Sequence, residues 1–115
     1  MSISPSSKVR VEIDGHTALV TIDNPAANTW DRESLPALKQ VVEALNADRS
    51  IFALVITGAG NKFFSAGADL KLFADGDPEN AAVMGRLFGE AFETLSDFRG
   101  VSIAAINGFA MGGGL

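Results

Sequence analysis

Two short apolar runs, each followed at once by a glycine-rich loop, limit the possible folds of this chain most. Residues 51–57 read IFALVIT and residues 101–106 read VSIAAI, and both runs are rich in β-branched side chains. A nearly continuous apolar run of this length is typical of a strand that is covered on both faces, as the strands of parallel sheets are. The sequence therefore predicts a largely parallel sheet with both of these strands buried in it.

The chain before the first apolar run predicts a β-hairpin. Residues 8–13 and 17–22 alternate polar and apolar side chains, which suits half-buried strands. Asp14 and Gly15, between them, form a common hairpin turn pair. His16 completes this turn and is expected to lie at the surface.

Two helices are predicted, one on each side of the first apolar run. Apolar side chains from Leu35 to Leu45 fall on one face of a helix, and either Asp31 or Ser34 is suited to cap its start. A second helix begins at Asp77-Pro78, an N-cap followed by proline. Its apolar face consists of Met84, Leu87, Phe88, Ala91, Phe92, Leu95 and Phe98. The order β-β-α-β-α-β indicates the α/β class.

Glycines occur in two settings that call for different explanations. Residues 58–69 and 108–114 are glycine-rich loops that follow the predicted strands, where ligand sites of parallel α/β sheets lie. Such loops expose backbone N–H groups, so that two of them can aim two N–H groups at one oxygen; the alternative is that both are only tight turns. Gly85 and Gly89, inside the second helix, predict that another backbone packs closely there.

Composition excludes several classes of function. The net charge of −5 argues against a surface that binds nucleic acid. The chain has no cysteine, so it has no disulfide, thiolate nucleophile or zinc–thiolate site. No apolar run approaches the about 20 residues that span a membrane. We expect a cytoplasmic protein that binds neither nucleic acid nor membrane.

Familiar catalytic motifs are incomplete in this chain. The segment GAGNKF has Phe63 where a dinucleotide-binding fingerprint has its third glycine. Ser65 stands in FFSAG, which lacks the first glycine of a G-x-S-x-G nucleophile elbow. With His16 as the single histidine, a serine–histidine–acid triad is not expected. The acidic residues match no calcium-binding loop, and no metal site is predicted.

FFSAGADLK at residues 63–71 and AAINGFAMGGGL at residues 104–115 are the most specific motifs of the chain. Together with ALVITGAGNK and NPAANTW, they resemble the enoyl-CoA hydratase/isomerase family, the crotonase superfamily. The resemblance runs from about residue 8 to the end. It implies a crotonase-like (ClpP/crotonase) α/β fold, a spiral of β-β-α units that is incomplete here. Residues 1–115 are accordingly expected to be the N-terminal part of a crotonase-like domain, with the C-terminal remainder absent.

The resemblance also implies an oxyanion hole. Members of this family bind acyl-CoA thioesters and stabilise an enolate-like anion on the thioester oxygen with two backbone N–H groups. The corresponding groups here belong to Ala68 and Gly113, and we expect them to converge on one point. Coenzyme A is part of the substrate, so no separate cofactor is expected.

Six further residues correspond to the family's coenzyme A contacts. They are Ala26 and Ala27 of the NPAANT loop, and Ala66, Asp69, Leu70 and Lys71 of AGADLK. Lys71 either meets a phosphate or is simply a solvated lysine. The NPAANT loop is one residue shorter than in many relatives, between Pro25 and Asn28.

The activity implied by the resemblance is that of an enoyl-CoA hydratase, a lyase that adds water to 2-enoyl-CoA in fatty-acid degradation. In hydratases of the family a glutamate follows GGG-x and a second acid comes later. The sequence stops at Leu115, so the 115-residue chain is expected to be inactive alone. The alternatives are isomerisation or thioester hydrolysis on the same fold, or a non-catalytic acyl-CoA-binding subunit. By resemblance, the complete protein is a homotrimer or hexamer.

Overall fold

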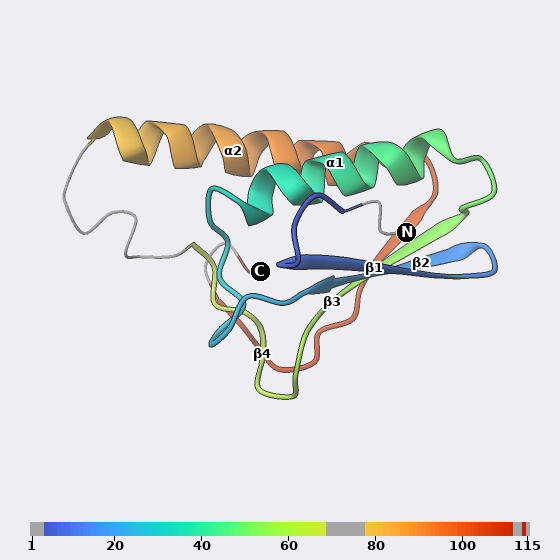
Figure 1. Cartoon of the computed structure of the whole chain (residues 1–115), viewed down its shortest axis with the longest axis horizontal. Coiled ribbons are helices and arrows are strands. Elements are labelled where there is room, and N and C mark those ends of the chain that lie inside the picture. Colours follow the sequence, from blue (N-terminus) through green and yellow to red (C-terminus); the bar gives the residue numbers. More distant parts are fainter. Residues whose placement is uncertain (1–3, 69–77, 112–113, 115) are drawn as a thin grey trace.

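The molecule is built on a four-stranded sheet with two helices on one of its faces (Figure 1). The computed structural model describes residues 4–68, 78–111 and 114. The order of the strands in the sheet is β1-β2-β3-β5. These strands are β1 (Val9–Asp14), β2 (Thr17–Ile22), β3 (Ala53–Gly58) and β5 (Val101–Ala104).

The predicted hairpin and the parallel sheet are both confirmed. β1 pairs with β2 antiparallel, and Gly15 in the turn has a φ of 61°, a conformation that glycine adopts without steric cost. β2 pairs with β3 in parallel, and β3 pairs with β5 in parallel. Parallel strands need long crossover connections. The two helices supply these connections, as the order of elements predicted.

The helices are α1 (Ser34–Ala47) and α2 (Pro78–Ser96). The residue directly before α1, Glu33, makes no side-chain capping hydrogen bond. The predicted Asp31 caps the turn that leads into the helix, because its carboxylate accepts hydrogen bonds from the backbone N–H groups of Glu33 (3.0 Å) and Ser34 (2.8 Å), and its carbonyl accepts the N–H of Leu35. The predicted apolar face of α1 is also buried: Leu35, Leu38, Val41, Val42 and Leu45.

One hydrophobic core joins the helices to the sheet. Alternate residues of β2 and β3 are buried, since successive side chains of a strand point to opposite faces. From α2, Met84 and Ala91 are buried, and the neighbouring apolar side chains are partly buried against the same core. Trp30 is 1% exposed and packs edge-on against Phe92, with ring centroids 5.5 Å apart. Each large side chain buried in this way contributes about 1.5–3 kcal/mol to folding.

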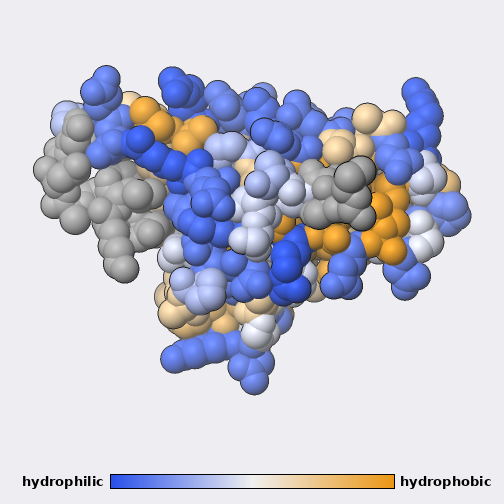
Figure 2. Space-filling model, viewed as in Figure 1, coloured by the Kyte–Doolittle hydropathy of each residue, from blue (hydrophilic) through white to orange (hydrophobic). Residues whose placement is uncertain are grey.

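The sheet is less covered than the two apolar runs predicted. On β3 only alternate residues are buried, and every residue of β5 is exposed, with Val101 at 60% and Ile103 at 49%. The reason is that both described helices pack on one face, while β5 is an edge strand. Exposed large hydrophobic side chains are Ile13, Phe52, Val101, Ile103, Ile106, Phe109 and Met111. Figure 2 shows hydrophobic surface at several separate places on the face drawn.

Two further predictions differ from the structure. Residues predicted as glycine-rich loops contain two short strands, β4 (Phe63–Ser65) and β6 (Phe109–Ala110), which pair in parallel as a second sheet. Strands of two or three residues are too short to show a periodicity in the sequence. The close packing predicted at Gly85 and Gly89 is wrong, because a Cβ at either position would meet no atom within 4 Å in the described structure.

The glycines therefore differ sharply in what a Cβ would meet, and this gives a paired prediction. At Gly58 a Cβ would meet the Phe64 carbonyl oxygen and lie 2.6 Å from that of Phe63. We expect Gly58→Ala to lower the free energy of unfolding of the complete protein by about 2 kcal/mol or more, through overpacking. Gly89→Ala is expected to raise it by about 0.5–1 kcal/mol, because alanine favours a helix. Chemical denaturation measures the free energy of unfolding of both variants. Equal changes in the two would contradict the prediction that Gly58 is required for space and Gly89 is not.

Candidate active site

Three loops lie side by side where the parallel strands end. Ile22 of β2 pairs with Gly58 of β3, and Ala104 of β5 pairs with Ile56, so the three strands end at the same edge of the sheet. The segments that follow are residues 23–30, 59–68 and 105–111. The sheet topology thus gathers segments that are far apart in the sequence, as the location of ligand sites in parallel sheets requires.

The first two of these segments are joined by backbone pairing. The N–H of Ala66 donates to the carbonyl of Ala27 (3.0 Å), and the N–H of Trp30 donates to the carbonyl of Gly67 (2.7 Å). Trp30 also forms an isolated parallel bridge with Ala68. The Trp30 side chain lies in the hydrophobic core, so this pairing anchors residues 66–68 to the interior.

Asn28 fixes the first segment from inside. Its side chain is 3% exposed and its φ is 52°, a left-handed conformation that asparagine tolerates better than most residues. The side-chain Nδ2 donates to the carbonyl oxygens of Ala59 and Phe63, both at 3.1 Å, and Oδ1 accepts the N–H of Asn24 at 3.1 Å. A buried amide with all of these partners specifies one arrangement of the loops.

Asn107 holds the third segment in a similar way. Its Nδ2 donates to the carbonyl oxygens of Gly58 and Gly60, both at 2.9 Å, and its Oδ1 accepts the N–H of Gly58 at 3.1 Å. Nδ2 also lies 3.4 Å from the Phe63 carbonyl oxygen, to which Asn28 donates. Two side-chain amides, from two different loops, thus converge on the start of β4.

The third segment packs directly on β4. The N–H of Phe109 donates to the carbonyl of Lys62 (2.9 Å), and the N–H of Met111 donates to the carbonyl of Ser65 (3.0 Å). A Cβ at Gly114 would lie 2.7 Å from the Ser65 carbonyl carbon, so only glycine fits there without a shift. Met111 and Gly114 therefore both contact Ser65. Gly113, between them in the sequence, lies outside the described residues.

The orientation of the Ala68 N–H follows from its neighbours. The peptide between Gly67 and Ala68 is trans, so its C=O and N–H point in opposite directions. Because the Gly67 carbonyl accepts a hydrogen bond from Trp30, the Ala68 N–H points away from Trp30. Within the described residues it donates to no other group. Gly67 has a φ of 92°, which disfavours any side chain at that position.

The residues predicted to contact coenzyme A are only partly described. Ala26 is exposed, whereas Ala27 and Ala66 are partly exposed and joined by the hydrogen bond already given. All three lie on the two paired segments next to Ala68. Asp69, Leu70 and Lys71 lie outside the described residues. The coenzyme A contacts and the convergence of Ala68 with Gly113 remain predictions.

A salt bridge ties the N-terminal part of the chain to this region. Lys8 Nζ lies 2.6 Å from Asp31 Oδ2, which also accepts a hydrogen bond from Asn24 at 3.2 Å. Burial alone would raise the pKa of the Asp31 carboxyl, but hydrogen bonds from Lys8, Ser34 and Glu33 outweigh it and hold this pKa below its ordinary value of 3.8. The hydrogen bond between Lys8 and Asp31 also raises the pKa of Lys8.

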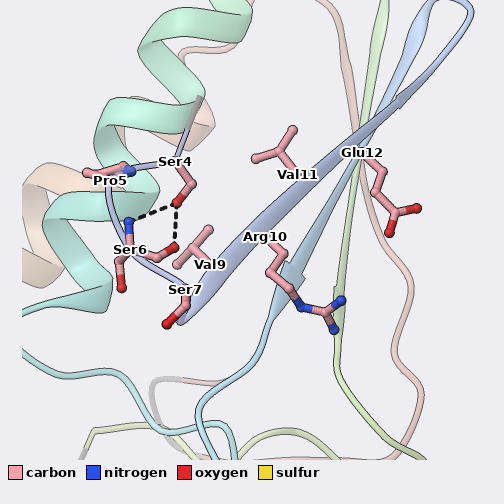
Figure 3. Close-up of a pocket in the computed structure, with 8 residues that line it drawn as sticks. All are labelled: Ser4, Pro5, Ser6, Ser7, Val9, Arg10, Val11 and Glu12. Atoms are coloured by element: carbon pink, nitrogen blue, oxygen red, sulfur yellow. Dashed lines mark hydrogen bonds between the residues drawn. The ribbon is translucent and has the colours of Figure 1, made fainter. Parts of the chain in front are cut away.

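A pocket of about 450 Å³ lies between residues 4–7 and β1, away from the three loops (Figure 3). None of the predicted site residues lines it. Ser4 and Ser6 bond to each other on one side of it: Ser4 Oγ donates to the Ser6 carbonyl (2.8 Å) and accepts the Ser6 N–H (3.3 Å). Arg10 is paired with Asp23. Elsewhere in the described part of the chain, no three acidic or histidine side chains cluster as metal ligands, and no helix is long and apolar enough to cross a membrane.

Comparison with known proteins identifies the family. The model of the enoyl-CoA hydratase/isomerase family matches residues 12–115. The chain therefore belongs to this family, and the resemblance and the crotonase-like α/β fold predicted from the sequence are confirmed.

Individual relatives agree with this assignment. The chain is 35% identical over 109 residues to the short-chain-enoyl-CoA hydratase of Clostridium acetobutylicum, covering 94% of this chain and 42% of that protein. It is 67% identical to Pseudomonas aeruginosa DspI, whose solved structure it matches with a TM-score of 0.92 over 95% of this chain and 42% of that one. It also matches the Bacillus anthracis enoyl-CoA hydratase structure at 29% identity and a TM-score of 0.90, covering 94% and 43%. The chain thus spans about two fifths of each relative's length.

Sequence reasoning did not identify the residues that support the site. Ser65 was considered only as a nucleophile, and Asn28 and Asn107 were not singled out. The available signal was weak: both asparagines lie in glycine-rich or proline-containing loops after strands, where a polar side chain is usually taken as part of a turn. The burial of Asn28 and the hydrogen bonds of Asn107 to Gly58 and Gly60 make them structural amides, and both depend on tertiary contacts.

The lowered pKa of Asp31 predicts an acid-sensitive contribution to stability. A carboxyl whose folded pKa lies below its unfolded value stabilises the protein above the unfolded value, and this stabilisation is lost as the pH falls through the folded pKa. We expect Asp31→Asn, which can still cap α1, to lower the free energy of unfolding at neutral pH and to flatten its decline between about pH 5 and pH 2. Urea denaturation across this pH range measures the effect.

Lys8→Met provides the matched variant. It removes the hydrogen bond that lowers the pKa of Asp31 most and leaves the carboxyl in place. This change is expected to bring the folded pKa of Asp31 nearer to 3.8, and so to reduce the same pH dependence. If the free energy of unfolding of both variants declined with falling pH as steeply as that of wild type, Asp31 would contribute nothing to stability through its charge.

Proposed function

We propose that the complete protein containing this chain is an enoyl-CoA hydratase, a lyase that adds water to 2-enoyl-CoA thioesters in fatty-acid degradation. Family membership and the named hydratases among its relatives support an acyl-CoA substrate. The observation that carries the proposal is the backbone N–H of Ala68, which points away from its pairing partner Trp30 and donates to no described group.

In the proposed reaction, the oxygen of water bonds to C3 of the substrate while one of its O–H bonds breaks and releases a proton. The electrons of the C2=C3 double bond move toward the carbonyl, so that negative charge develops on the thioester oxygen. The enolate then takes a proton at C2 and the carbonyl re-forms, giving 3-hydroxyacyl-CoA. A donor aimed at that oxygen stabilises the transition state more than the substrate, and this is how it accelerates the reaction.

The role assigned to this chain is stabilisation of the anion. The N–H groups of Ala68 and Gly113 are proposed to donate to the thioester oxygen. Ser65 supports this assignment, because it lies three residues before Ala68 and contacts Met111 and Gly114 on either side of Gly113. We assign the acid–base steps to no residue of this chain.

The remaining parts of the proposal concern binding and assembly. Ala26, Ala27, Ala66, Asp69, Leu70 and Lys71 are proposed to bind the coenzyme A part of the substrate, with no additional cofactor or metal. The protein is proposed to be a cytoplasmic homotrimer or hexamer. The exposed hydrophobic side chains of β5 are consistent with a surface that other polypeptide covers.

The test uses the backbone donor itself. Ala68→Pro removes the N–H group, and we expect it to lower the kcat for hydration of crotonyl-CoA by about 10²–10³-fold, the usual cost of losing one oxyanion donor. Ala68→Ser keeps the N–H and is expected to retain most of the activity. Absorbance of the enoyl thioester follows turnover, while circular dichroism checks the fold of each variant.

Other products would indicate a different reaction. Migration of the double bond without uptake of water would indicate an isomerase, and release of free coenzyme A would indicate a thioester hydrolase. Binding of acyl-CoA without any turnover would indicate a non-catalytic subunit. If Ala68→Pro and Ala68→Ser had equal kcat values, the role of the backbone donor would be wrong.

A further inference from the structure

We propose that Ser65 is a positioning residue for the oxyanion donor, which it orients through Gly67 while coupling the two donor loops. This inference rests on the function proposed above. Ser65 is 0% exposed, so it cannot act as a nucleophile toward a ligand in the described structure. Its hydroxyl and carbonyl are nevertheless both engaged, and their partners belong to three different loops.

The hydroxyl clamps the first two loops together. Ser65 Oγ donates to the Asn28 carbonyl at 2.7 Å and accepts the Gly67 N–H at 3.2 Å. The Gly67 carbonyl, at the other end of the residue, accepts the N–H of Trp30. Gly67 is therefore held at both of its backbone polar groups.

This double hold has a direct consequence for Ala68. Glycine at a φ of 92° has no side chain to restrict its backbone, so hydrogen bonds must fix its conformation. Without the Ser65 hydroxyl, only the bond from Trp30 to the Gly67 carbonyl would remain. The Ala66–Gly67 peptide, which carries the Gly67 N–H, would then lose its hold, and the Gly67–Ala68 peptide would depend on the Trp30 bond alone, so that the Ala68 N–H could tilt.

The carbonyl of the same residue reaches the second donor loop. It accepts the Met111 N–H at 3.0 Å, and Gly114 packs against it. One residue thus holds the turn before one proposed donor and contacts Met111 and Gly114, which flank the other in the sequence. A displacement of about 1 Å at a reacting centre can cost 100-fold in rate, so this coupling bears on catalysis.

Ser34 supplies a matched control. It is also 0% exposed, its Oγ donates to Asp31 Oδ1 at 3.0 Å, and it accepts the Asp31 N–H at 2.9 Å. Ser34→Ala and Ser65→Ala therefore each remove one buried hydroxyl with one donated and one accepted hydrogen bond. A purely structural role for Ser65 predicts that the two variants behave alike.

The experiment compares these variants in the complete protein. For Ser65→Ala we expect kcat for crotonyl-CoA to fall by about ten- to a hundredfold with KM nearly unchanged, and kcat of Ser34→Ala to stay near wild type. The carbonyl stretch of bound crotonyl-CoA, measured by infrared difference spectroscopy, should shift less on binding to Ser65→Ala than to wild type. Both variants are expected to show a similar loss in the midpoint of thermal unfolding.

Equal kcat and equal carbonyl shifts in wild type and Ser65→Ala would overturn the inference while leaving the proposed hydratase intact. A wild-type protein that shifts the carbonyl but adds no water would overturn the hydratase alone, because the comparison of the carbonyl shifts still tests Ser65. If wild type binds no acyl-CoA, both proposals fail. Should Ser65→Ala not fold, Ser65→Cys, with a similar size and a weaker hydrogen-bonding group, takes its place with the same expected direction.

Discussion

The backbone pairing of residues 27–30 with residues 66–68 is the interaction on which the candidate site depends. It is possible because β2 and β3 end in register, so the chain leaves both strands at the same height of the sheet. Trp30 then links this pairing to the core through its buried ring. The position of the Ala68 N–H thereby depends on the packing of the Trp30 ring, which is distant from Ala68 in the sequence. The buried ring gives the loop a rigid support.

Glycine serves two separate purposes around this pairing. Gly67 is needed for its conformation, since a φ of 92° is costly for other residues. Gly58, Gly108 and Gly114 are needed for space, because a Cβ at each would meet backbone atoms of residues 62–65. The local excess of glycine noted in the sequence thus reflects β4, against which the neighbouring segments pack at backbone distance.

Local patterns in the sequence were sufficient to predict the helices and strands. They were insufficient to predict which segments cover them. The hairpin, both helices and the parallel order follow from periodicity, capping and turn residues, all of which act within a few neighbours. The exposure of β5 and the pairing of β4 with β6 depend on which other segments are present, and no local pattern carries that information. The same holds for Ser65: its type was visible, but its three partners are 37 or more residues away or belong to its own turn.

In a site that uses backbone donors, the chemistry does not restrict the side chains of the donor residues themselves. The side chain of Ala68 takes no part in the proposed donation, so its identity is restricted only by space. The constraint falls instead on buried groups that hold the loop around it: the hydroxyl of Ser65 and the N–H of Trp30, which hold Gly67, and the amide of Asn28, which holds the neighbouring loop. Removing one such group leaves buried partners unsatisfied, which costs more than the bond itself contributes. The side chains that orient the proposed backbone donors are therefore ones that do not touch the substrate.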